Sequence, residues 1–116
     1  MTITNCGTGA PLPIPNNPFP ALNTFEKNAT MLETGSRFFR SPGQGTWERT
    51  GHHEFLKRVL FFRFAADGTY LGTQEGTRQI HLTSPNTFTA EGTAVQRDTS
   101  GNVVLTACDR ETGERF

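Results

Sequence analysis

The chain has 116 residues, and its 11 Lys and Arg balance 11 Asp and Glu, so the formal net charge is zero. The length fits one domain over residues 1–116. The neutral balance argues against a nucleic-acid-binding domain, which needs a basic face. No segment is long and apolar enough to span a bilayer, and we expect no signal peptide, because the N-terminus lacks the basic-then-apolar order.

Composition favours an all-β fold. The chain has 18 Thr, 12 Gly and 10 Phe, against one Tyr and one Trp, and only 34% of its residues are hydrophobic. Thr and Phe favour pleated sheet, Gly interrupts it, and the helix-forming residues are sparse. Phe therefore supplies much of the predicted core.

The first elements are a short strand, a strap and a hairpin. Residues 2–6 alternate as a strand does. Residues 11–20 are rich in proline, which fixes φ and lacks an N–H, so they predict an extended strap over the surface or one end of the fold; the alternative is a polyproline ligand for a recognition domain. Residues 21–36 predict a hairpin that turns at Asn28-Ala29.

A loop at 41–45 precedes a predicted strand at 46–51. Residues 54–66 form the longest apolar segment, and their pattern alone does not exclude a helix. Because this segment runs into Asp67-Gly68-Thr69, a strong hairpin signal, we interpret it as a strand. Three further strands are predicted, at 70–82, 87–97 and 103–116.

These segments make about eight strands in an antiparallel up-and-down meander. An open sheet would expose two edges, so we expect the meander to close into a small barrel. Eight strands enclose a space that side chains can fill or that can hold one small ligand.

One face of the strand at 70–82 is the more apolar, and we expect it to point inward. This face carries Tyr70, Gly72, Gln74, Gly76, Arg78, Ile80 and Leu82. Small residues there and on the next strand leave volume that phenylalanines could line, although Phe could also simply fill the barrel. The predicted ligand-binding residues are Phe62, Phe64, Tyr70, Gln74, Arg78 and Phe88.

Arg78 and His53 are the candidate catalytic residues. A buried Arg78 needs a partner, and Glu33, Arg58 or Glu111 could join its network. Such a pair could bind a carboxylate or polarise a carbonyl. His53 could reach the barrel mouth as an acid–base group, or lie on the rim as most histidines do.

Cys6 and Cys108 lie on the first and last predicted strands. These strands would be neighbours in a closed sheet, so the two residues form either a disulfide or a pair of buried thiols. A disulfide would imply an oxidising compartment, periplasmic or extracellular. No C-x-x-C or H-x-x-x-H spacing occurs, so we expect neither a metal site nor a cofactor.

Gly45-Thr46-Trp47 at the start of a strand resembles the G-x-W signature of the calycin superfamily, the lipocalin-like barrels. The wider pattern (GTWERTG, DGT, and RF at the end) is similar to uncharacterised bacterial lipocalin-like proteins. The resemblance implies that Arg115, or else Arg110, packs over Trp47 and closes one end of the barrel. Lipocalins carry G-x-W on the first strand; here it lies mid-chain, so the topology is permuted or the tripeptide coincidental.

The favoured function is binding of a small hydrophobic or amphipathic molecule in a Phe-lined cavity. The alternatives are a cofactor-free isomerase, cyclase or lyase acting on a small apolar substrate, and an interaction module with a solid core. One strand carries Phe55, Phe61, Phe62 and Phe64 on both faces. Some of them must therefore face the strap or a second subunit of a homo-oligomer.

Overall fold

The computed structural model describes residues 1–37 and 39–115. Within these ranges all regular elements are strands: β1 (Thr2–Thr4), β2 (Ala21–Phe25), β3 (Thr30–Gly35), β4 (Gly43–Arg49), β5 (Glu54–Phe64), β6 (Tyr70–Ser84), β7 (Thr87–Arg97) and β8 (Val103–Glu114).

The eight strands form one antiparallel sheet in the order β1-β8-β7-β6-β5-β4-β3-β2, which confirms the all-β meander. The predicted loop at 41–45 was wrong in part, because Gly43 pairs with Glu33 and Gly45 with Val59 inside β4. The last strand was predicted to reach Phe116, which lies outside the described residues.

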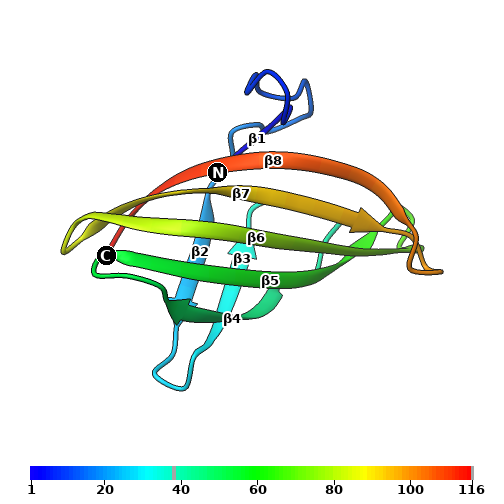
Figure 1. Ribbon diagram of the computed structural model, residues 1–116. Helices are drawn as coiled ribbons and strands as arrows, with labels where there is room; N and C mark the ends of the chain where they lie inside the picture. The colour runs from blue at the N-terminus through cyan, green and yellow to red at the C-terminus, as the bar shows by residue number, and fades with distance from the viewer. Residues whose placement is uncertain (38, 116) are drawn as a thin grey trace.

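The sheet is strongly curled but open, so the predicted closure into a barrel was wrong. β1 and β2 are its two edges, and β2 and β3 cross behind the long strands β5–β8 (Figure 1). Two backbone hydrogen bonds outside the strands connect the two edges. The Met1 ammonium donates to the Phe19 carbonyl at 2.8 Å, and the Phe19 N–H donates to the Met1 carbonyl at 2.9 Å. The result is a half-barrel with a concave inner face.

The strap explains why β1 does not need a strand partner on its outer edge. Leu12 donates to the Ile3 carbonyl, and the Asn17 side chain bonds both the N–H and the carbonyl of Ile3. Phe19 is buried at the end of the strap and packs with Ile3 and Ala107. Residues 11–20 thus bond along the outer edge of β1.

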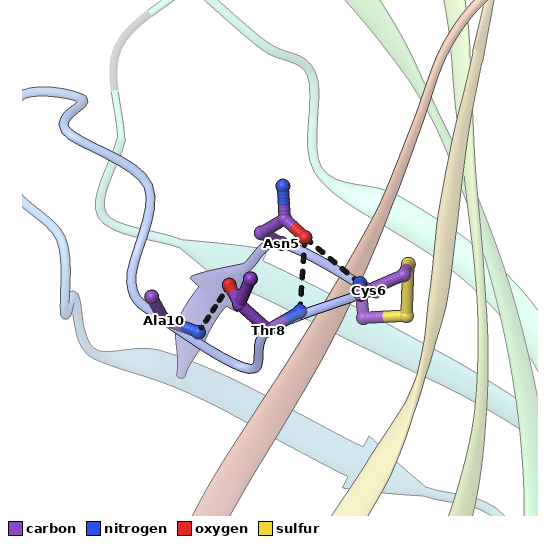
Figure 2. The surroundings of a disulfide bond; sticks show 6 residues. Asn5, Cys6, Thr8 and Ala10 are labelled. Carbon is purple, nitrogen blue, oxygen red and sulfur yellow. Dashed lines mark hydrogen bonds between the residues drawn. A yellow bond between two sulfur atoms is a disulfide. The ribbon is translucent and has the colours of Figure 1, made fainter.

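Cys6 and Cys108 form a disulfide, with Cα atoms 4.9 Å apart, so the described residues include no free thiol. The bond arises because β1 pairs with β8, where Thr4 lies opposite Cys108. Beside it, the Asn5 carboxamide oxygen accepts the N–H groups of Gly7 and Thr8 and fixes a tight turn (Figure 2). The disulfide and this turn attach the N-terminal segment to the last strand.

Inner and outer faces alternate along each long strand. The inner face of β6 carries the buried Gly72, Gly76, Arg78 and Ile80, which confirms the predicted orientation for this part of the strand. Tyr70 does not follow it: a register shift pairs Arg63 with Gly72 but Phe64 with Tyr70. The extra residue moves Tyr70 to the outer face.

Three hairpin turns share one hydrogen-bond pattern and place Ala29, Gly68 and Gly101 in the left-handed region, at φ 69°, 89° and 86°. A side chain at such a φ is strained, whereas glycine is not. We expect Ala29→Gly to raise the free energy of unfolding by about 1 kcal/mol. Urea denaturation measures it, and Ala66→Gly, in an exposed turn position with negative φ, is the control. No gain over that control would contradict the prediction.

Candidate functional site

A network of buried charges occupies the inner face of the half-barrel. At its centre the side chain of Lys57 is 0% exposed. Its ammonium donates to Glu111, to Asn23 at 3.1 Å and to Glu33 at 3.5 Å. These contacts use all three N–H groups of the lysine, so strands β2, β3, β5 and β8 meet at one nitrogen atom.

Arg78 is the second cation of the network. Its guanidinium bonds both carboxylate oxygens of Asp109 at 2.9 Å and reaches Glu33 at 3.4 Å. Burial alone would lower the pKa of Arg78, but the charges of Glu33 and Asp109 outweigh it and raise this pKa. Because the guanidinium pairs with these carboxylates, Arg78 has a structural role inside the half-barrel.

Arg40 is the third cation of the network and lies beside β5. It lies 3.8 Å from Glu33 and stacks over the Phe61 ring at 3.6 Å. Burial is the main cause that lowers the pKa of Arg40, followed by the charges of Arg78 and Arg37, while Glu33 opposes them. Its Nη2 has no hydrogen-bond partner among the described residues.

Small residues make room for this network. A Cβ on Gly76 would lie 2.9–3.0 Å from the Arg78 guanidinium, and alanines are buried beside it on β7 and β8. The volume that these small residues leave is thus filled by charged side chains. Burial of such charges requires pairing, and the network balances its members: Arg40, Lys57 and Arg78 against Glu33, Asp109 and Glu111.

The sequence identified part of this network. Glu33 and Glu111 were proposed as partners of Arg78, and both reach it. Arg58 does not: it lies on the outer face, where it pairs with Glu75. Lys57 and Asp109 were missed, although Lys57 alternates in phase with Phe55, Val59 and Phe61, which was the available signal.

Beside the network, a groove of about 840 Å³ separates β2 from the ends of β6, β7 and β8. Phe25, Leu82 and Phe88 provide apolar walls, and Asn23 and Glu111 are polar lining residues. Both of these polar residues contact the Lys57 ammonium. The groove therefore has an apolar body and a polar floor, the usual composition of a small-molecule site.

The predicted ligand-binding residues divide between the two faces. Phe88 lines the groove, and Gln74 lies on the inner face, where it accepts a hydrogen bond from Gln96. Phe62 and Phe64 lie on the outer face with Tyr70, at ring distances of 5.9 and 6.0 Å from it. Alternation along β5 and the register shift explain this placement, which separates these three rings from the groove.

His53 and Arg78 do not come together. His53 is exposed in the turn before β5 and its ring lies 4.1 Å from that of His52, whereas Arg78 is buried with Asp109. On the outer face, His81 contacts Glu54, and this hydrogen bond is the main reason that the pKa of Glu54 is lowered.

Trp47 lies on β4 between Phe25 and Phe55, with ring centroids 6.1 and 6.0 Å away, and donates its indole N–H to the backbone carbonyl of Glu26. Arg115 lies at the rim of the groove. In the described part of the chain, the cation–π contacts involve Arg37 and Arg40. The Trp–Arg packing that the calycin resemblance implies is thus not among them.

In the ranges 1–37 and 39–115, no three His, Cys, Asp or Glu side chains are arranged to hold a metal ion. The same ranges include no helix with the length and apolar character to cross a membrane. Comparisons with protein-family models, curated proteins and solved structures find no match to this chain.

Proposed function

We propose that this protein binds a small amphipathic molecule in the groove between β2 and β8. The observation that carries the proposal is the pairing of apolar walls, from Phe25, Leu82 and Phe88, with a polar floor of Asn23 and Glu111. The apolar part of a ligand would lie on the walls, and its polar end would meet the floor.

The rigidity of the floor supports this proposal. Asn23 and Glu111 come from the two strands that border the opening, and both are fixed by the buried Lys57. A preorganised polar floor lowers the ordering cost of binding. Phe88 is held as well: its ring covers Gly113, where an added Cβ would lie 2.1 Å from a ring carbon.

The test is displacement of a fluorescent apolar probe by simple amphiphiles, with native mass spectrometry to count bound molecules. We expect Phe88→Ala to weaken binding about tenfold or more, because it removes an apolar wall worth on the order of 2 kcal/mol of contact. Phe62→Ala is the matched control, since this ring is 51% exposed on the outer face. Equal losses in the two variants, or no binding by the native chain, would contradict the proposal.

A further inference from the structure

The polar floor of the groove offers one free donor group, the Asn23 amide nitrogen with its two N–H. Asn23 turns its carboxamide oxygen to Lys57 at 3.1 Å, and this orientation is required because an ammonium only donates. The amide nitrogen is therefore left over. Among the described residues, no acceptor bonds to it, and Asn23 lines the groove.

The same floor offers one free acceptor. Glu111 gives its Oε1 to Lys57. Its Oε2 receives no hydrogen bond from any described residue, and Arg78 Nε is 3.9 Å away, too far for one. A carboxylate oxygen accepts up to two hydrogen bonds, so Oε2 can accept a donor from a ligand in the groove.

The local charge disfavours an anion. Lys57 and Arg78 are the cations next to Glu111, and they face three carboxylates, Glu33, Asp109 and Glu111. Arg40, which completes the balance, contacts the network through Glu33 and stacks on Phe61. At the floor, a ligand carboxylate would thus meet Glu111, whose neighbouring cations Lys57 and Arg78 already pair within the network. The other cations that line the groove are Arg115, at its rim, and the Met1 ammonium, which donates to the Phe19 carbonyl.

Resting on the proposed function, we infer that the occupant is a neutral alcohol. Its hydroxyl group donates to Glu111 Oε2 and accepts from the Asn23 amide, so both free groups of the floor are used by one atom. A protonated amine only donates and leaves the Asn23 N–H unpaired, and a carboxylate only accepts and is repelled by Glu111. The apolar body lies along Phe25, Leu82 and Phe88.

The experiment compares three ligands with one apolar tail: n-decanol, decanoate and decylammonium, each competing against the fluorescent probe at neutral pH. We expect decanol to bind at least about tenfold more tightly than decanoate, as unpaired or repelled polar groups cost on this order. Tightest binding of decanoate or decylammonium would overturn the alcohol assignment and leave the proposed function standing. No binding of any ligand or of the probe would overturn both.

Two variants locate the selectivity in the floor. Glu111→Gln removes the repelling charge, so the preference for decanol over decanoate should fall severalfold. Asn23→Asp removes the amide donor and keeps an oxygen atom that the Lys57 ammonium can bond; decanol should weaken about tenfold and decylammonium should gain. Glu75→Gln, on the outer face where Glu75 pairs with Arg58, is the control and should keep the native preference. Native selectivity in the folded Asn23→Asp protein would contradict the inference.

Discussion

Lys57→Met is expected to lower the free energy of unfolding by about 3–5 kcal/mol, the usual cost of removing one partner from a buried charge pair. The methionine fills the space, but Glu111 and Asn23 lose their donor. Glu33 keeps its ion pairs with Arg78 and Arg40. The loss of stability therefore comes mainly from the Glu111 carboxylate. Urea denaturation of the oxidised protein, followed by circular dichroism, measures the change.

Arg58→Met is the matched control for this variant. Arg58 is the next residue of β5, but its side chain is 62% exposed on the outer face and pairs with Glu75. Exposed pairs contribute at most about 1 kcal/mol. A double variant that adds Glu111→Leu to Lys57→Met removes both charges and should recover much of the loss. If the loss is the same in the Lys57 and Arg58 variants, the network does not stabilise the fold.

Replacement of Cys6 and Cys108 by Ser is expected to lower the free energy of unfolding by about 4 kcal/mol, because the disulfide joins residues 102 positions apart and restricts the unfolded chain. β1 should be the first element to open. It has three residues, and the disulfide ties its end to β8. Hydrogen exchange at Ile3 and neighbouring amides should accelerate more than exchange in β6.

Reduction of the native disulfide provides the control. A reductant should lower the stability of the native protein to that of the Ser variant and leave the Ser variant unchanged. Cys6 is exposed, so reductants can reach the bond. Equal denaturation midpoints for the oxidised and reduced protein would contradict a stabilising role.

Strand positions were predictable because the local signals are strong. β5 and β6 were found from the apolar run at 54–66 and the Asp67-Gly68 turn, and the structure confirms the hairpin with Gly68 in the left-handed region. The inner face of β6 followed from its alternation. The outward position of Tyr70 was not predictable from alternation, because the register shift beside Phe64 depends on the pairing of two strands.

The candidate site was only partly predictable. Alternation along the strands predicts Arg78 and Phe88 as inward-facing residues, and the need of a buried arginine for a partner points to Glu33 and Glu111. The burial of Lys57 was not predicted, although this residue lies between apolar residues of the same strand face. A lysine in an amphipathic strand usually lies at the surface, and only the carboxylates from β3 and β8 make its burial acceptable.

The sequence by itself determined the all-β class, the eight strands and the inward face of β6 from Gly72 onward, because turn residues and alternation act within a few positions of the chain. The tertiary structure decided that the sheet stays open and that its interior is charged. The sheet stays open because the strap, and not another strand, bonds the outer edge of β1. The charged interior depends on strands distant in sequence, because Lys57 finds its partners on β2, β3 and β8. Pairing of buried charges is a property of the folded arrangement, and so is the groove that it supports.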